Sequence, residues 1–110
     1  MNPDISIIIP LYNEVDNIEP LSHSIINAMQ GQNYEVIFVD DGSTDGSTKK
    51  LKEWCAQHTN FRAIHFKKNA GQTAAMDAGF KHAAGKYVVS MDADMQNDPA
   101  DIPKLLEKLN

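Results

Sequence analysis

The chain has 110 residues, of which 42% are hydrophobic and 23% charged, a composition typical of one globular domain and unlike that of disordered or fibrous chains. Its net charge of −5 argues against a general nucleic-acid-binding protein, which would carry a basic face. Cys55 is the only cysteine, so a disulfide framework is excluded and a reducing, cytoplasmic setting is expected. The longest apolar run, from Ile5 to Leu11, is far shorter than the roughly 20 residues of a membrane-spanning helix.

Short β-rich runs alternate with longer helical stretches along the chain, which is typical of βαβ units around a parallel sheet. In chain order the predicted elements are strand 5–9, helix 14–30, strand 35–39, a helix capped by Asp45 or Ser47, strand 62–66, helix 72–84, strand 86–91 and a last helix near Pro99. Three of these helices carry an apolar stripe at helical spacing, formed by Ile18, Leu21, Ile25 and Met29, by Leu51, Trp54, Cys55 and His58, and by Ile102, Leu105, Leu106 and Leu109. The sequence therefore predicts an α/β fold with a mostly parallel sheet in three α/β/α layers.

Polar residues follow three of the predicted strands at their carboxyl ends, where ligands collect in an open parallel sheet. These clusters are residues 10–14, 40–47 and 92–96. Asp41 offers acceptors to a base N–H or a ribose hydroxyl, and Tyr12 offers a ring that can stack on a base. The clusters therefore indicate a nucleoside site, although residues 40–47 are equally typical of a turn with a helix cap, and both roles can hold at once.

Asp92 and Asp94 come directly after the last predicted strand. Two residues apart in an extended chain, they project to one side while Ala93 points away. Mg²⁺ is commonly bound by one or two carboxylates together with substrate phosphates and water. An Asp-x-Asp pair is also common in solvated turns, but its place after a strand favours a site for a divalent cation and a phosphate.

A further loop, Asn69 to Gln72, opens the third predicted helix, where free N–H groups and the helix dipole favour an anion. The same Asn-x-Gly pattern is found in ordinary turns. The four histidines show no metal-ligand spacing and are interpreted as structural or surface residues: His23, His58, His65 and His82.

Four segments, in this order and with these gaps, resemble the nucleotide-sugar half of the family 2 glycosyltransferases. They are Ile-Ile-Ile-Pro-Leu-Tyr-Asn-Glu, Val-Asp-Asp-Gly-Ser-Thr-Asp-Gly, Asn-x-Gly-x-x-x-Ala and Met-Asp-Ala-Asp-Met-Gln-Asn-Asp-Pro. The resemblance covers practically the whole chain and is strongest to enzymes like the polyprenyl- or dolichyl-phosphate mannose synthases.

The resemblance implies a Rossmann-like GT-A fold, a UDP- or GDP-type sugar donor, and Mg²⁺ or Mn²⁺ as cofactor. By this similarity the base and ribose would be bound by Pro10, Tyr12, Glu14, Val39 and Asp41. Asp92 and Ala93 would approach the ribose and diphosphate. Asp92 and Asp94 would be the catalytic residues and, with Gln96, the metal ligands.

Enzymes of this family typically transfer the sugar with inversion, using a carboxylate beyond the donor half as general base unless the acceptor is an anionic phosphate. Residues 1–110 contain no counterpart of that base. We therefore expect them to be the donor-binding part of a longer protein, inactive alone and self-associating through an uncovered strand edge. The full-length protein would act on a lipid-phosphate or glycan acceptor at the cytoplasmic face of the membrane, and its missing parts would make the membrane contact.

Three other hypotheses compete with this one. A haloacid dehalogenase-type phosphatase carries Asp-x-Asp after its first strand, whereas here the pair follows the fourth. A receiver domain carries an acidic pair after its first strand, where this chain has Asn13 and Glu14. A nucleotide-binding module without transfer activity differs from the enzyme only in the missing half, and this alternative stays open.

Overall fold

The structure is a computed structural model that describes residues 2–94 and 98–104. Within these residues, four strands form one sheet in the order β3-β2-β1-β4, and every neighbouring pair is parallel. The strands are β1 (Ile5–Leu11), β2 (Tyr34–Asp40), β3 (Phe61–His65) and β4 (Tyr87–Ser90). The helices are α1 (Ile18–Ala28), which follows the short 3₁₀ helix η1 (Val15–Asn17), α2 (Ser47–Gln57) and α3 (Gln72–His82). Among the described residues, no helix has the length and apolar character needed to cross a membrane.

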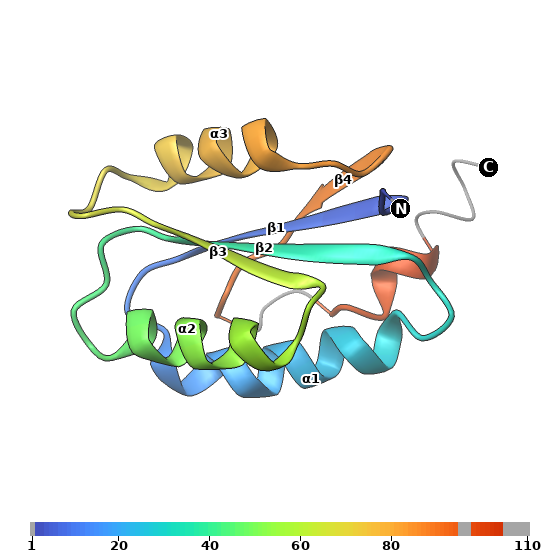
Figure 1. Ribbon diagram of the computed structural model, residues 1–110, viewed down its shortest axis with the longest axis horizontal. Helices are drawn as coiled ribbons and strands as arrows, with labels where there is room; N and C mark the ends of the chain where they lie inside the picture. The colour runs from blue at the N-terminus through green and yellow to red at the C-terminus, as the bar shows by residue number, and fades with distance from the viewer. Residues whose placement is uncertain (1, 95–97, 105–110) are drawn as a thin grey trace.

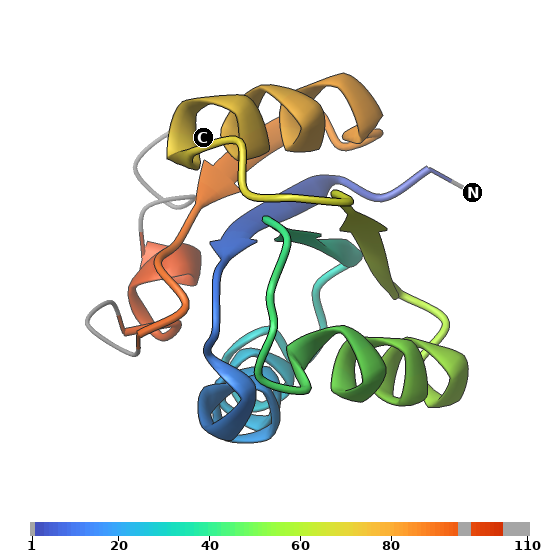
Figure 2. The ribbon, with the colours of Figure 1, turned by 90° about the vertical axis from the view of Figure 1, so that its left-hand side faces the viewer.

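Helices cover both faces of the sheet, with α1 and α2 on one side and α3 on the other (Figures 1 and 2). The side chains of β1 alternate between two core clusters, as a strand requires. Ile7 and Ile9 belong to the larger cluster with the residues of α1 and α2, whereas Ile8 packs in the smaller cluster with Ala75 of α3. The near-continuous aliphatic run of β1 follows from burial on both faces. The predicted three-layer α/β fold is thus confirmed.

The element boundaries differ from the predicted ones by a few residues. The predicted helix 14–30 is divided into η1 and α1, and the turn after it contains Gly31 at φ 81°. Helix α2 begins at Ser47, and the carboxylate of Asp45 accepts hydrogen bonds from the Ser47 N–H and hydroxyl. Residues 101–104 are helical and Ile102 is buried, whereas Leu105, Leu106 and Leu109 lie outside the described residues.

Helix α3 lies close to β1 because Gly79 has no side chain. A Cβ atom placed on Gly79 would lie 2.3 Å from Cγ2 of Ile8, which is fully buried. The neighbouring strand side chain has no space into which it can move, since protein interiors are close-packed. Gly79 therefore sets the distance between α3 and the sheet.

Gly79→Ala is expected to destabilise the chain even though alanine is the better helix former. The gain in helix propensity is about 1 kcal/mol, whereas overpacking a core costs about 1–3 kcal/mol, so we expect a net loss of up to about 2 kcal/mol in the free energy of unfolding. Urea denaturation followed by circular dichroism measures this change. The same substitution in an Ile8→Ala background should cost less, because the colliding methyl group is gone. Equal costs in both backgrounds would contradict the contact.

Glu35 joins three strands near their amino ends and is 8% exposed. Its Oε2 accepts hydrogen bonds from the Ser6 hydroxyl (2.6 Å) and the Ala84 N–H (2.8 Å), and its Oε1 accepts one from Nη2 of Arg62 (2.8 Å). The Gly85 N–H donates to the Ser6 hydroxyl at 2.8 Å. Burial by itself raises the pKa of Glu35, but these hydrogen bonds and the Arg62 charge outweigh it and hold the pKa below its ordinary value. The network fixes the segment before β4 to β1 and β2.

Candidate functional site

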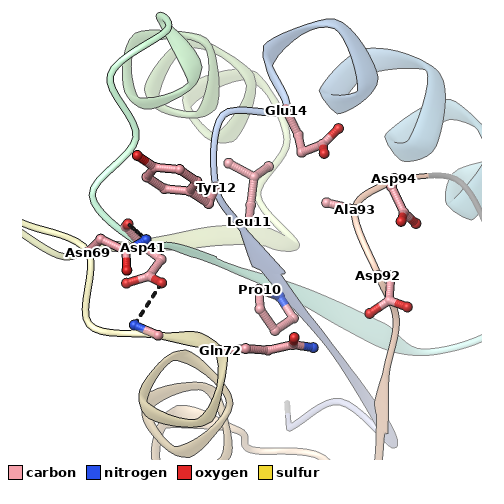
Figure 3. Close-up of a pocket in the computed structure, with 11 residues that line it drawn as sticks. Pro10, Leu11, Tyr12, Glu14, Asp41, Asn69, Gln72, Asp92, Ala93 and Asp94 are labelled. Atoms are coloured by element: carbon pink, nitrogen blue, oxygen red, sulfur yellow. Dashed lines mark hydrogen bonds between the residues drawn. The ribbon is translucent and has the colours of Figure 1, made fainter.

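A cavity of about 530 Å³ lies at the carboxyl ends of the strands. The chain runs outward from β1 through β2 to β3 and then places β4 on the other side of β1, so the cavity is at the switch point of the sheet, where ligands bind in open α/β folds. Its size suits a small-molecule ligand. The lining residues come from the ends of β1, β2 and β4 and from the start of α3: Pro10, Leu11, Tyr12, Glu14, Asp41, Asn69, Gly71, Gln72, Asp92, Ala93 and Asp94 (Figure 3).

Most of the described residues predicted for the site line this one cavity: Pro10, Tyr12, Glu14, Asp41, Asp92, Ala93 and Asp94. Val39 does not. It is fully buried in the smaller core cluster with Ile8 and Ala75, so its side chain packs in the core near the end of β2. Gln96 lies outside the described residues.

Four lining residues were absent from the predicted site: Leu11, Asn69, Gly71 and Gln72. The sequence singles out the loop from Asn69 to Gln72 as an anion-binding helix start but gives it no place beside the other clusters. The position follows from the pairing of β3 with β2, which brings the loops after these two strands together. The strand order would have supplied this signal, but the local sequence patterns do not give it.

The lining of the cavity is acidic. Among its described residues it has no lysine, arginine or histidine, but it has four carboxylic side chains, those of Glu14, Asp41, Asp92 and Asp94. Such a set of charges repels a phosphate unless a cation is bound with it. The cavity is therefore suited to an anion that arrives together with a metal ion.

Asp92 and Asp94 have the chemistry that a hard divalent cation requires. Both side chains are exposed, whereas Ala93 between them is 6% exposed and packs in the core, as the alternation predicts. Within residues 2–94 and 98–104, no group of three or more His, Cys, Asp or Glu side chains is arranged to hold a metal ion. Two carboxylates supply part of a coordination shell, and Mg²⁺ commonly completes it with phosphate oxygens and water. The residues present therefore fit Mg²⁺ or Mn²⁺ bound together with a phosphate ligand.

The loops after β1 and β2 are held together by hydrogen bonds from backbone N–H groups to side-chain oxygens. They run from Asn13 N–H to Ser43 Oγ (3.0 Å), from Thr44 N–H to Asn13 Oδ1 (2.7 Å), from Glu14 N–H to Ser47 Oγ (3.2 Å) and from Val15 N–H to Asp45 Oδ2 (3.2 Å). Asn13 has φ 54°, a left-handed conformation that asparagine tolerates well. The polar residues of segment 43–47 thus position the loop that carries Tyr12 and Glu14.

Asp40 has a structural role beside the cavity. It is 1% exposed, and its carboxylate accepts hydrogen bonds from the Ser43 N–H (3.0 Å) and the Thr48 hydroxyl (2.5 Å) and contacts Nδ1 of His65 at 2.9 Å. Burial raises the pKa of Asp40, but the hydrogen bonds from Thr48, His65 and Ser43 outweigh it and hold the pKa below its ordinary value. The two roles that the sequence left open for residues 40–47 are therefore divided, since Asp40 organises the turn and Asp41 lies at the cavity.

The histidines and Cys55 lie outside the set of residues that line the cavity. His58 stacks on Trp54 with ring centroids 3.9 Å apart, and His23 meets the same ring edge-on at 5.2 Å. Burial raises the pKa of the Cys55 thiol to about 11, so little thiolate is present at neutral pH. These residues pack the structure, in line with their interpretation from the sequence.

The sequence matches the family described as Glycosyl transferase family 2 over residues 6–110. Dolichol-phosphate mannosyltransferase of Pyrococcus furiosus is 44% identical over 105 residues, which make up 96% of this chain and 30% of that protein. Undecaprenyl-phosphate 4-deoxy-4-formamido-L-arabinose transferase of Edwardsiella ictaluri is 43% identical over 107 residues, covering 94% of this chain and 33% of that protein. The chain thus spans about a third of the length of the curated relatives it matches.

Two solved structures have the same arrangement of strands and helices. The mannosyltransferase PcManGT from Pyrobaculum calidifontis, in complex with GDP-Man and Mn²⁺, is 30% identical with a TM-score of 0.74, over 86% of this chain and 28% of that one. TarS from S. aureus, in complex with UDP-GlcNAc, is 27% identical with a TM-score of 0.76, over 97% of this chain and 30% of that one. The expected GT-A fold is confirmed. With nearly its whole length matched, the chain belongs to glycosyl transferase family 2.

Proposed function

We propose that this chain is the donor-binding part of a glycosyltransferase that moves a sugar from a GDP- or UDP-sugar to a polyprenyl phosphate. The observation that carries the proposal is the acidic cavity at the switch point, with Asp92 and Asp94 on its wall. The relatives support it, because by name they transfer sugars to dolichol phosphate or undecaprenyl phosphate. The structural neighbours hold GDP-Man with Mn²⁺ in one case and UDP-GlcNAc in the other.

Each part of the donor has a candidate partner. The ring of Tyr12 is 47% exposed and offers a surface on which the base can stack, beside Pro10. Asp92 and Ala93 lie where the ribose and the diphosphate would pass, and Asp94, together with Gln96, would complete the protein's share of the metal site.

The reaction breaks the bond between the sugar C1 and a diphosphate oxygen and forms one between C1 and a phosphate oxygen of the acceptor. A divalent cation held by Asp92 and Asp94 would neutralise negative charge on the departing nucleoside diphosphate. An acceptor that is already an anionic phosphate has no proton to lose, so this chemistry requires no general base among residues 1–110. The rest of the full-length protein would then bind the acceptor at the cytoplasmic face of the membrane.

We propose that the chain alone binds the donor without transferring its sugar, because the relatives are about three times as long. Its strand β4 is at the edge of the sheet, and Val88 on β4 and Phe80 on α3 are 39% and 49% exposed. Apolar side chains beside an uncovered edge promote association. Self-association of the isolated chain therefore stays a prediction.

Calorimetric titration of the chain with GDP and with UDP tests the donor site. We expect one of the two nucleotides to bind in the presence of Mn²⁺ and to bind at least about a hundredfold more weakly with EDTA, since the acidic cavity repels an uncompensated diphosphate. Binding that does not depend on the metal would contradict the site. Failure of both nucleotides to bind with Mn²⁺ would likewise contradict the donor site.

A further inference from the structure

The loop from Asn69 to Gln72 forms one wall of the cavity. It connects β3 to α3, and Asn69, Gly71 and Gln72 all line the cavity. The position of this loop therefore sets the shape of the space that a ligand can occupy. Two contacts between this loop and the end of β2 decide where it lies.

The first contact is made by the carboxylate of Asp41, which is 5% exposed. Its Oδ1 accepts a hydrogen bond from the Ala70 N–H at 2.7 Å. Its Oδ2 accepts one from the Gly71 N–H at 3.0 Å, which is drawn as a dashed line in Figure 3. In addition, the side-chain amide of Asn69 donates to the main-chain oxygen of Asp41 at 3.3 Å. Both carboxylate oxygens thus accept hydrogen bonds from the loop.

The second contact is the close approach of two backbones at Gly42. A Cβ atom at this residue would lie 2.4 Å from the nitrogen of Asn69 and 2.5 Å from the carbonyl carbon of Lys68. These are backbone atoms, so only a movement of the whole loop can relieve the collision. Gly42 also has φ 73°, a conformation in which glycine is strongly preferred.

We propose that Asp41 and Gly42 are positioning residues, which hold the Asn69–Gln72 loop in the place where it closes the donor cavity. The proposal rests on the proposed function, because it assigns to that site the residues that shape it. A nearly buried carboxylate whose oxygens both accept backbone N–H groups holds the loop, whether or not it also contacts a nucleoside. Charge-assisted hydrogen bonds to backbone N–H groups are among the stronger ones in proteins, so this contact can hold the loop in place.

Hydrogen exchange of the Ala70 and Gly71 amides, measured by NMR without nucleotide, tests the first contact. We expect both amides to be protected in the unmodified chain. In Asp41→Asn the side-chain NH₂ group would face one of the two N–H groups, so exchange at Ala70 and Gly71 should be at least about tenfold faster. Circular dichroism should show an unchanged fold. If these amides in the unmodified chain exchange as fast as in an unfolded peptide, the proposal is wrong.

Gly42→Ala tests the second contact and leaves the carboxylate of Asp41 in place. Gly31→Ala is its matched control, because Gly31 has φ 81° but nothing within 4 Å of a built Cβ atom. Both variants carry the same kind of backbone strain, and only Gly42→Ala moves the loop. We expect the Kd for the nucleotide that binds with Mn²⁺ to rise about tenfold or more in Gly42→Ala and to stay within about twofold in Gly31→Ala.

The results separate positioning from direct contact. If Asp41→Asn weakens nucleotide binding while Ala70 and Gly71 stay protected, Asp41 contacts the nucleotide directly and the proposal is overturned. Unchanged binding in Gly42→Ala would overturn it as well. If the proposed function is wrong, the pattern of results differs. The unmodified chain would then bind neither nucleotide, although its Ala70 and Gly71 amides would be protected.

Discussion

Replacing Asp94 by alanine is expected to abolish the Mn²⁺-dependent binding of GDP or UDP to this chain while leaving its fold unchanged. Asp94 is exposed on the cavity wall, two residues after Asp92, which lines the same cavity. Changes in the outer shell of a metal site already cost about 10–100-fold in affinity, so loss of a direct ligand should cost more than about a hundredfold. Calorimetry with each nucleotide and Mn²⁺ measures the loss.

Asp77→Ala is the matched control for this substitution. Asp77 is an exposed carboxylate on α3 that pairs with Lys81 and is not part of the cavity lining. Because surface ion pairs contribute little, this variant should bind nucleotide like the unmodified chain. Unchanged affinity for the nucleotide in Asp94→Ala would show that Asp94 is not a metal ligand. Loss of binding together with the circular dichroism signal would show a structural role instead.

Glu35→Ala is expected to lower the free energy of unfolding by about 2–4 kcal/mol, because it leaves several donors without their acceptor. The Ser6 hydroxyl and the Ala84 N–H lose the oxygen to which they donate, and the Arg62 guanidinium loses its counter-charge. Arg62 is about half exposed, so water compensates part of that loss. Urea denaturation at neutral pH measures the change. Glu53→Ala, at an exposed position of α2, should change stability by less than about 0.5 kcal/mol.

The contribution of Glu35 to the free energy of unfolding is also expected to decrease at low pH. Its pKa in the folded chain lies below the unfolded value, so the folded state favours the ionised form. The stabilisation is therefore complete above the unfolded pKa and is lost as the pH falls through the folded pKa. Stability should decline in acid less steeply in Glu35→Gln than in the unmodified chain. Parallel declines would mean that other carboxylates, such as Asp40 with its lowered pKa, account for the acid sensitivity.

The sequence predicts the fold well where a local pattern has one physical cause. The aliphatic run at the start of the chain indicates a strand buried on both faces, and the stripe of Ile18, Leu21 and Ile25 identifies the buried face of α1. The end of α3 could not be predicted in this way. The helix stops at His82, and the extended segment that follows places the Ala84 N–H on Glu35, a residue 49 positions earlier in the chain.

The candidate site could likewise be predicted only in part from local sequence patterns. Polar residues directly after strands were enough to identify Tyr12, Asp41, Asp92 and Asp94 as neighbours, because parallel strands end at one edge of the sheet. Asp40 is the last residue of β2 and Asp41 follows it, and the side to which each projects depends on the sheet as a whole. The bonds from Asp41 to the following loop depend on β3 pairing with β2, which is a property of the whole sheet.

The network around Glu35 has a consequence at the opposite end of β4. It fixes Ala84 to Glu35 of β2 and Gly85 to Ser6 of β1, and β4 then pairs residue by residue with β1 until the Met91 N–H reaches the carbonyl of Ile8. Because successive side chains of a strand alternate, a slip of one residue would turn Ala93 outward and both aspartates inward. Glu35 therefore helps to fix the register of β4 against β1. The placement of Asp92 and Asp94 at the cavity thus depends on contacts at the opposite, amino-terminal end of β4.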